Sequence, residues 1–235
     1  MNLIIDIGNT FVKYAVFSNN DIIYFLKDKD FDNDIANQVI KDYKVSSCII
    51  SSVREKISYN LKTSSVFELS HKTKIPFNII YSNKETLGAD RIAAIVGATE
   101  LHRNNNILII DAGTCITFDY IDNNSNYRGG RISPGIMLRY RSLFDYTSKL
   151  PFLEKNKDYD FLGMNTKNCI ISGVQNGIVS EIQEIINVIK KENDDLLVII
   201  TGGDAFFFEK EFKNTIFADE HLLIKGLNRI LEYNA

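Results

Sequence analysis

The sequence predicts an α/β fold made of two related halves with a cleft between them. Three observations support this prediction. Short apolar runs alternate with segments of helical periodicity along all 235 residues. A motif of apolar strand, Asp, glycine turn and Thr opens the chain and returns near its middle. An Asn tract at 104–106 separates the two copies, so the predicted domains are residues 1–106 and 107–235.

Composition and charge exclude several classes of protein. Hydrophobic residues make up 45% of the chain, which is enough for a sizeable core. The net charge of −3 comes without a basic stripe, so we expect no nucleic-acid partner and no membrane surface. No apolar run approaches the roughly 18 residues of a membrane span, and the first residues do not resemble a signal peptide.

The three cysteines, Cys48, Cys115 and Cys169, are too few and too widely spaced for a disulfide framework or a zinc site. Small buried thiols are the usual role of such residues. We therefore expect a cytoplasmic protein.

The first half reads as a strand-rich unit with two helices. Apolar runs predict strands at 3–7, 11–17, 22–26, 48–53 and 77–81. The spacing of Ile35, Val39, Ile40 and Tyr43 predicts a helix, and a second helical pattern covers 90–102.

The second half repeats the opening pattern. Strands are predicted at 107–110 and 116–121, with a turn at 111–114 between them. A long helix is predicted from about 168 to 191, followed by a strand at 197–201. A final helix carries Leu223, Leu227, Ile230 and Leu231.

The repeated turns, DIGNT from Asp6 and DAGT from Asp111, suit a phosphate-binding role. Glycine lets backbone N–H groups approach a phosphate closely, and Thr10 and Thr114 add hydroxyls. A bridging Mg²⁺ needs carboxylate oxygens, which Asp6 and Asp111 supply at the strand ends. For a single copy, a turn-capping side chain is the better explanation of Asp6. Two copies, each at the start of a half, favour phosphate binding.

A third glycine turn, Gly202-Gly203, follows the late strand and is a candidate for contact with a nucleoside. A plain turn is the alternative. Two facing phosphate turns and a nucleoside contact are the parts that phosphoryl transfer requires, because that reaction depends on positioning and charge stabilisation.

Further motifs occur in a fixed order along the whole chain. They are DIGNTFVK at 6–13, LGADRIAAIVGA at 87–98, DAGTCITFD at 111–119, GGRISPG at 129–135, TSKLP at 147–151, NTKNCIISGVQNG at 165–177 and TGGDA at 201–205. This ordered set resembles the type III pantothenate kinases, within the superfamily of acetate and sugar kinases, heat-shock 70 proteins and actin. The resemblance implies two ribonuclease-H-like domains, each a mixed sheet flanked by helices, with an ATP cleft between them.

The resemblance also implies an activity. Members of that family use ATP to phosphorylate pantothenate to 4'-phosphopantothenate, the first step of coenzyme A biosynthesis. They are cytoplasmic homodimers that use ATP with Mg²⁺ and need a monovalent cation, K⁺ or NH₄⁺.

Carried over by position, the resemblance implies a set of nucleotide and cation contacts. The first phosphate loop would comprise Asp6, Ile7, Gly8, Asn9, Thr10, Phe11, Val12 and Lys13. Within it, Asp6 would hold Mg²⁺, directly or through water, and Lys13 would place a point charge on the phosphates. Thr114 would contact ATP, and Asp111 would ligate the monovalent cation. An exposed strand lysine is the alternative for Lys13.

The resemblance assigns the acceptor side in the same way. Asp90, with Gly88 and Ala89 before it, would be the general base, and Arg91 would hold the substrate carboxylate. The alternatives are a helix N-cap for Asp90 and a surface ion pair for Arg91.

Two residues outside that motif complete the implied substrate contacts, Tyr81 and Thr166. A core aromatic is the alternative for Tyr81, and a helix N-cap for Thr166. Gly129, Gly130, Pro134 and Gly135 would shape a loop over the cleft, or form a plain hairpin and helix start.

Two other functions stay open. One is a kinase of the same superfamily that acts on another hydroxylated metabolite such as a sugar, in which case Arg91 meets no carboxylate. The other is a non-catalytic regulatory protein on this fold, such as a transcription accessory. The presence of Asp6, Asp90 and Asp111 together favours an enzyme.

Overall fold

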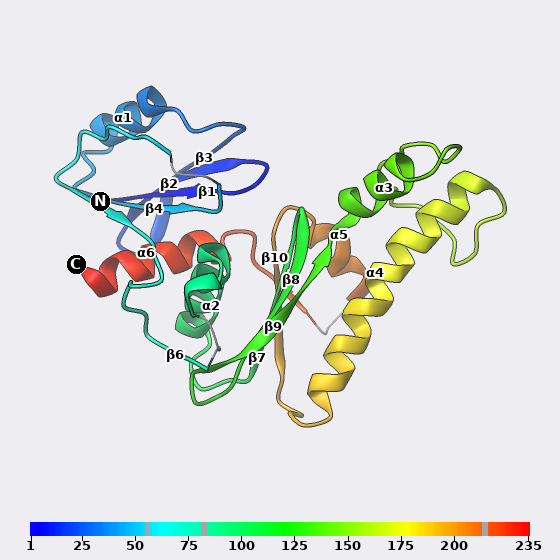
Figure 1. Ribbon diagram of the computed structural model, residues 1–235. Helices are drawn as coiled ribbons and strands as arrows, with labels where there is room; N and C mark the ends of the chain where they lie inside the picture. Colours follow the sequence, from blue (N-terminus) through cyan, green and yellow to red (C-terminus); the bar gives the residue numbers. More distant parts are fainter. Residues whose placement is uncertain (55–56, 81–83, 213–215) are drawn as a thin grey trace. The chain divides into compact units, whose positions relative to one another are not determined.

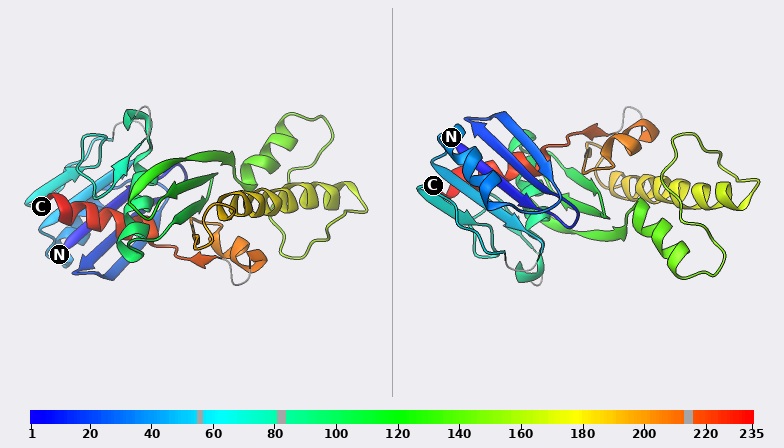
Figure 2. Two further views of the ribbon diagram at one scale, coloured as in Figure 1. Left: turned by 90° about the horizontal axis from the view of Figure 1, so that it is seen from below. Right: turned by 90° about the horizontal axis from the view of Figure 1, so that it is seen from above.

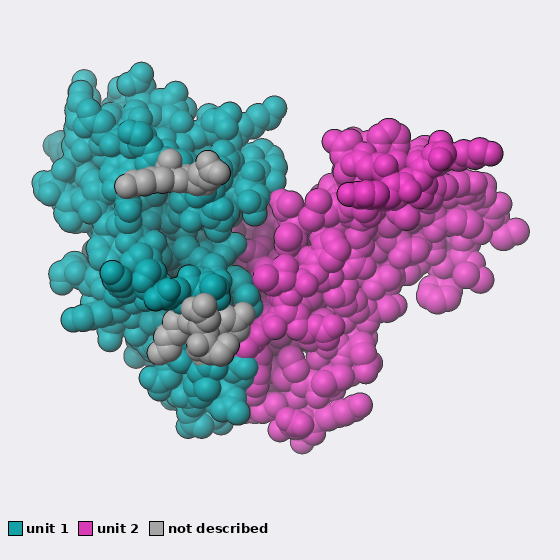
Figure 3. All heavy atoms as spheres, viewed as in Figure 1, with its two compact units in different colours: residues 1–104, 121–128, 221–235 teal, residues 105–120, 129–220 magenta. Residues whose placement is uncertain are grey.

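The computed structural model describes residues 1–54, 57–80, 84–212 and 216–235. The chain forms two compact units (Figure 3). Unit 1 contains residues 1–104, 121–128 and 221–235, and unit 2 contains 105–120 and 129–220. The first break between units lies two residues from the sequence-predicted boundary at 106/107. The division into domains 1–106 and 107–235 stays a prediction.

The sheet of unit 1 has five strands in the order β3-β2-β1-β4-β5. Neighbours β1–β2 and β2–β3 are antiparallel, whereas β1–β4 and β4–β5 are parallel. The strands are β1 Asn2–Ile7, β2 Val12–Ser18, β3 Asp21–Asp28, β4 Ser47–Ser52 and β5 Ser65–Glu68.

Helices cover both faces of this sheet. On one face, α1 (Asn33–Asp42) packs with alternate residues of β1, Leu3, Ile5 and Ile7. On the other face, α2 (Ala89–Leu101) and α6 (Leu222–Asn234) contact the sheet. Figure 2 shows α6 in front of the sheet in its left view and α1 in front in its right view.

The helices α2 and α6 touch through their backbones. A Cβ at Gly226 would lie 1.8 Å from the Ala93 carbonyl oxygen, and one at Gly97 would lie 2.3 Å from the Leu222 carbonyl oxygen. Both distances are far below contact, so only glycine fits at these crossing points. Gly97 of the LGADRIAAIVGA motif thus has a packing role.

The second sheet has the order β11-β10-β7-β8-β9-β6. Apart from β6, this order repeats that of the first sheet, with the parallel neighbours β7–β10 and β10–β11 matching β1–β4 and β4–β5. The predicted α/β fold with two mixed sheets flanked by helices is confirmed. The strands are β6 Asn78–Ile79, β7 Ile107–Ala112, β8 Cys115–Ile121, β9 Asn126–Pro134, β10 Leu197–Thr201 and β11 Phe217–Ala218.

The long predicted helix is α4, Thr166–Lys190, and its apolar stripe packs in the core of unit 2. Val174, Ile178 and Ile182 of this stripe are buried with residues of β7, β8 and β10. The remaining helical elements are η1 Lys84–Thr86, α3 Ile136–Asp145, α5 Ala205–Glu209 and η2 Lys210–Phe212. Among the described residues, no helix combines the length and the apolar character that crossing a bilayer requires.

Two predicted elements differ from the structure. The strand expected at 77–81 is only the two-residue β6 in the described part of that range. The glycine-rich loop expected at 129–134 is the second half of β9, because β9 lies between β8 and β6 and pairs as part of the sheet. The sequence patterns also did not indicate β5, β11 and α5, whereas the helix start given as the alternative for Gly135 is confirmed, since Gly135 is the N-cap of α3.

Candidate active site

The first phosphate-loop motif joins β1 to β2 in unit 1. The Gly8 N–H donates to the Phe11 carbonyl at 3.0 Å and closes the turn. A Cβ at Gly8 would lie 3.2 Å from that same carbonyl oxygen, so the chain passes close to itself here. Asn9, Thr10 and Phe11 are exposed at the tip.

Polar residues form a row across the end of the first sheet. Asp6 is in register with Lys13 on β2 and with Ser51 on β4, and Lys13 is in register with Lys27 on β3. Side chains alternate along a strand, and Ile5 and Ile7 face the core under α1. Asp6 therefore faces the side of α2 and α6, where its Oδ2 lies 3.5 Å from Lys13 Nζ.

The candidate base Asp90 lies in the first turn of α2, and its charge affects the pKa of Asp6. Burial raises the pKa of Asp6, and the negative charge of Asp90 raises it further, while Lys13 lowers it. The two carboxylates therefore lie close enough for their charges to interact. The N-cap of α2 is Gly88, so the helix-cap alternative for Asp90 is wrong.

Gly88 makes space for the Asp90 carboxylate. A Cβ at Gly88 would lie 2.5 Å from Asp90 Oδ1, which accepts the Arg91 N–H at 2.8 Å. The absence of a side chain at Gly88 therefore sets where the carboxylate can lie.

Arg91 is buried, with 8% of its surface exposed. Its Nη2 donates to the hydroxyl of Tyr127 at 2.8 Å, and Tyr127 is fully buried on β9. The surface-ion-pair alternative for Arg91 is therefore wrong. Tyr127 is a site residue that the sequence patterns did not indicate. The predicted contact Tyr81 lies outside the described residues.

The second loop motif joins β7 to β8 in unit 2. The Gly113 N–H donates to the Cys115 carbonyl at 2.9 Å, and the Gly135 N–H donates to the Thr114 carbonyl at 3.0 Å. A Cβ at Gly135 would lie 2.1 Å from the Gly113 carbonyl oxygen. The glycine of the SPG motif is thus explained by backbone packing against this loop.

The Gly202-Gly203 turn packs against the same loop. Thr201 is in register with Asp111, and a Cβ at Gly202 would lie 2.3 Å from Asp111 Oδ1 and 2.4 Å from the Ala112 carbonyl oxygen. Gly202 also has a φ of +94°, which favours glycine. Asp204, which follows this turn, accepts a hydrogen bond from Lys155 Nζ at 2.6 Å.

Thr166 begins α4 and borders a groove of unit 2 about 960 Å³ in volume. The N-cap is Asn165, whose side chain accepts the Asn168 N–H at 2.9 Å, so Thr166 is not the cap. The groove is lined by Arg139, Ser142, Leu143, Leu150, Gly163, Met164, Asn165, Thr166, Cys169, Ile170, Gly173 and Val174.

Two members of the polar row of unit 1, Lys27 and Ser51, lie outside the sequence motifs. Lys27 Nζ lies 3.9 Å from the ring centroid of Phe11 in the first loop. The Ser51 hydroxyl is buried beside Asp6 and has no hydrogen-bond partner among the described residues. Strand register identifies both, and the sequence motifs contain neither.

The donor set of the site fits a magnesium ion held mostly by water. The described residues contain no group of three or more His, Cys, Asp or Glu side chains able to enclose a metal ion. Mg²⁺ keeps several waters and takes one or two carboxylates together with substrate phosphates. Asp6, whose ionised form burial disfavours, gains from a neighbouring cation.

Comparisons of sequence agree on one family. The family model described as type III pantothenate kinase matches residues 2–188. A type III pantothenate kinase of Christiangramia forsetii is 41% identical, covering 100% of this chain and 99% of the relative. One from Phocaeicola vulgatus is 39% identical with the same coverage.

Comparisons of structure support the fold. A Campylobacter jejuni protein described as belonging to the Baf family of transcriptional activators has a TM-score of 0.65 at 23% identity, covering 99% of this chain and 98% of that one. A glucokinase from an Antarctic psychrotroph has a TM-score of 0.51 at 11% identity, covering 99% and 98%. With the sequence matches across the whole chain, the conclusion is that this protein belongs to the type III pantothenate kinase family.

Proposed function

We propose that the protein transfers the γ-phosphoryl group of ATP to the primary hydroxyl of pantothenate, which makes 4'-phosphopantothenate for coenzyme A biosynthesis. The observation that carries this proposal is that Asp6 faces the side of the first sheet that α2 covers, and that the first turn of α2 contains Asp90. It brings a phosphate-loop carboxylate and a candidate base together from distant parts of the sequence. The names of the relatives in the family support the choice of substrate.

Asp90 would accept the proton of the attacking hydroxyl. A primary alcohol is a poor nucleophile, and a carboxylate within hydrogen-bond reach contributes about 10²- to 10⁴-fold in rate. Asp90 lies in the first turn of α2.

The first loop, residues 6–13, would bind the phosphates through its backbone N–H groups and Lys13. Asp6 would hold Mg²⁺, directly or through water. When bound, the ion offsets the charge that develops on the transferring phosphoryl group. Lys27, beside Phe11 of this loop, adds a second positive charge to the same row.

In unit 2, Thr114 would contact ATP and Asp111 would ligate K⁺ or NH₄⁺. Asp111 Oδ1 and the Ala112 carbonyl oxygen lie near each other, because a Cβ at Gly202 would come within 2.3 Å of the first and 2.4 Å of the second. Oxygen atoms gathered in this way suit a large monovalent cation.

The acceptor would be held by Arg91 at its carboxylate, with Gly88 and Ala89 giving the substrate access to Asp90. The hydrogen bond from Arg91 to Tyr127 orients the guanidinium, which forms planar, paired contacts with carboxylates. Tyr81 and Thr166 would complete the pantothenate contacts.

We also propose a homodimer, which the apolar surface around the groove of unit 2 supports. The side chains of Tyr146, Phe161, Leu162 and Met164 are 74–93% exposed beside it. An apolar patch of this kind is usual for an interface and unusual for a free surface. The three cysteines are free thiols, which is consistent with a cytoplasmic location.

The test is ADP release by the purified protein with magnesium ATP and pantothenate, glucose or no acceptor. We expect pantothenate alone to stimulate release, and K⁺ or NH₄⁺ to be required. Stimulation by glucose instead would indicate a sugar kinase, and no stimulation by any acceptor would favour a regulatory role. Equal activity in Na⁺ and K⁺, or an Asp111→Asn enzyme with unchanged K⁺ dependence, would contradict the cation assignment.

A further inference from the structure

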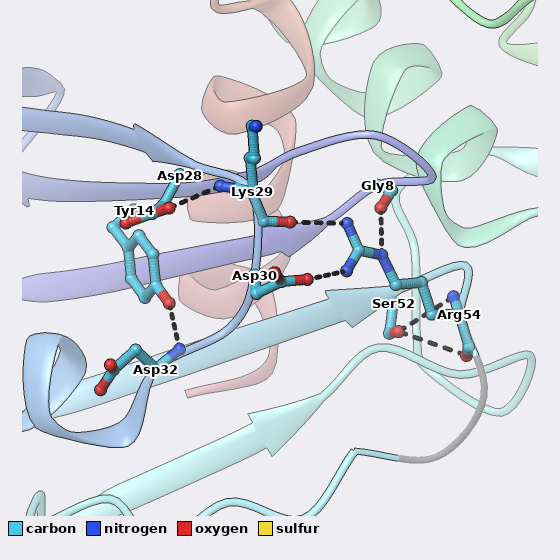
Figure 4. Close-up of polar contacts among 8 residues, drawn as sticks. All are labelled: Gly8, Tyr14, Asp28, Lys29, Asp30, Asp32, Ser52 and Arg54. Atoms are coloured by element: carbon cyan, nitrogen blue, oxygen red, sulfur yellow. Dashed lines mark hydrogen bonds and ion pairs between the residues drawn. The ribbon is translucent and has the colours of Figure 1, made fainter.

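Arg54, just beyond the end of β4, connects three parts of unit 1 through one guanidinium group (Figure 4). Its Nε donates to the Gly8 carbonyl at 2.7 Å. Its Nη2 donates to the Lys29 carbonyl at 3.0 Å, and its Nη1 lies 3.3 Å from Asp30 Oδ1. The side chain is 26% exposed, so most of it is withdrawn from water.

The backbone around Arg54 is itself fixed. The Arg54 N–H donates to the Ser52 hydroxyl at 3.2 Å, and the Val53 N–H donates to the Ile7 carbonyl at 3.1 Å. The guanidinium thus extends from a strand end that is already paired with β1, beside the phosphate loop.

The segment after β3, which the guanidinium also contacts, is fixed by hydrogen bonds of its own. The Lys29 N–H donates to Asp28 Oδ1 at 2.6 Å, and the Asp32 N–H donates to the Tyr14 hydroxyl at 2.9 Å (Figure 4). Tyr14 lies on β2, the strand that follows the loop. Arg54 therefore connects the Gly8 carbonyl to fixed structure on both sides.

Fixing the Gly8 carbonyl also fixes the next N–H group. The Gly8 carbonyl and the Asn9 N–H belong to one planar trans peptide and point in opposite directions. Glycine has wide conformational freedom, so this peptide plane would otherwise rotate easily. With the Gly8 N–H bonded to Phe11, the contact with Arg54 holds the Asn9 N–H pointing away from the guanidinium.

We propose that Arg54 is a positioning residue for the nucleotide phosphates, which it serves by holding the Gly8–Asn9 peptide in the orientation that binds them. The proposal rests on the function proposed above for the first loop. It assigns Arg54 no contact with substrate. Its role is to pre-organise a backbone donor, and pre-organisation strengthens binding by reducing what must be ordered when the ligand arrives.

The signature of this role is a selective effect on ATP. Loss of a charged hydrogen bond that holds a binding group is expected to weaken binding by about tenfold or more. In Arg54→Ala we expect the KM for ATP to rise by that factor, while the KM for pantothenate changes less than twofold. Arg54→Lys keeps the charge and one donor but not the three-way contact, so it should raise the KM for ATP by about threefold.

Arg103→Ala is the matched control, because Arg103 is an exposed arginine of unit 1 whose guanidinium pairs with Glu100. Its KM for ATP should stay within twofold of the parent value. If Arg54→Ala does not fold, Arg54→Lys carries the test. A KM for ATP within twofold of the parent in the folded Arg54 variants overturns the proposal, as does a full return to parent behaviour in Arg54→Lys.

Binding of a fluorescent ATP analogue to the parent and variants separates this proposal from the proposed function. A parent protein that binds the analogue without phosphorylating pantothenate refutes the acceptor assignment, and the Arg54 comparison then proceeds by binding alone, with the same expected factors. A parent protein that binds no ATP overturns both.

Discussion

Asp6 and Asp90 lie close enough in unit 1 for their charges to interact, and the charge of Asp90 opposes ionisation of Asp6. Lys13 offsets part of that repulsion from 3.5 Å. Such an arrangement is common where charged substrates or metal ions bind, because the bound ligand supplies the missing positive charge. The two carboxylates have separate proposed roles, and separate variants test them.

Asp90→Asn keeps the shape of the side chain but removes the base. We expect a folded protein whose turnover of pantothenate is lower by about 10²-fold or more, with the KM for ATP within twofold of the parent value. Steady-state kinetics with varied ATP and pantothenate make the measurement. Turnover within a few-fold of the parent would mean that the base lies elsewhere.

Asp6→Asn tests the pKa of Asp6 through stability. The folded pKa is raised above the 3.8 of an ordinary Asp, so the folded protein holds this proton more tightly than the unfolded chain does. The free energy of unfolding therefore falls as pH rises from about 3.8 through the raised pKa. Replacing the carboxylate by an amide, which does not ionise, abolishes this pH-dependent fall in the free energy of unfolding.

We accordingly expect nucleotide-free Asp6→Asn to melt about 2 °C or more above the parent at pH 7.5, with a smaller difference at pH 4.5. Lys13 loses its partner in this variant, but burial and Asp90 together outweigh Lys13 in setting the direction of the pKa shift. Thermal unfolding at both pH values provides the measurement. An equal difference at the two pH values would contradict this reading of Asp6.

Gly88→Ala tests the placement of the Asp90 carboxylate. The backbone of Gly88, at φ −57° and ψ 139°, suits alanine, so no backbone strain is expected. The new methyl group would meet Asp90 Oδ1 at 2.5 Å and displace it. We expect turnover to fall by about tenfold, with a melting temperature within about 2 °C of the parent. Unchanged turnover would show that Asp90 tolerates the displacement.

At the scale of elements, the crossing of α2 and α6 holds Asp90 and Arg91 over the first sheet. Both helices contact that sheet, and their backbones meet at Gly97 and Gly226. Because α2 begins with the candidate base, the distance between these helices also sets where the base lies.

Gly226→Ala should separate the two helices. Its methyl group would lie 1.8 Å from a backbone carbonyl of α2, which cannot rotate away as a side chain can. We expect a loss of about 1–3 kcal/mol in the free energy of unfolding, measured by denaturant titration. Gly177→Ala in α4 is the matched control, because its methyl would meet only a side-chain atom at 3.9 Å. It should raise stability by up to about 1 kcal/mol. Equal effects of the two substitutions would contradict the close crossing.

At the scale of the whole molecule, the apolar surface around the groove of unit 2 predicts self-association. Light scattering should give about twice the 26.8 kDa chain mass at micromolar concentration. The double change Leu162→Asp and Met164→Asp places charges at two of the most exposed apolar positions and should give a monomer. Leu101→Asp, at an exposed apolar site in unit 1, is the control and should leave the dimer intact. A parent protein of monomer mass would refute the prediction.

The amino-acid sequence alone determined the repeated strand, turn and strand that open each half, because each copy depends on local features. Apolar runs of strand length, the Asp-Gly-Thr turns after β1 and β7, and the helical spacing in α4 are all read within short windows. The motif around Asp90 is equally short, but its role was implied by the resemblance to the family. Period and turn chemistry act over a few residues, so they are visible before the chain folds.

The tertiary structure decided which distant residues meet. No local pattern indicates that α6 packs on α2 in unit 1, that Tyr127 bonds Arg91, or that Arg54 holds the Gly8 carbonyl. These contacts depend on strand register and helix packing, which are set by the shape of the whole core and leave no periodic trace in the sequence. The sequence thus determined the motif residues of the site, whereas packing within unit 1 brought them together and added residues, such as Tyr127, that no motif contains.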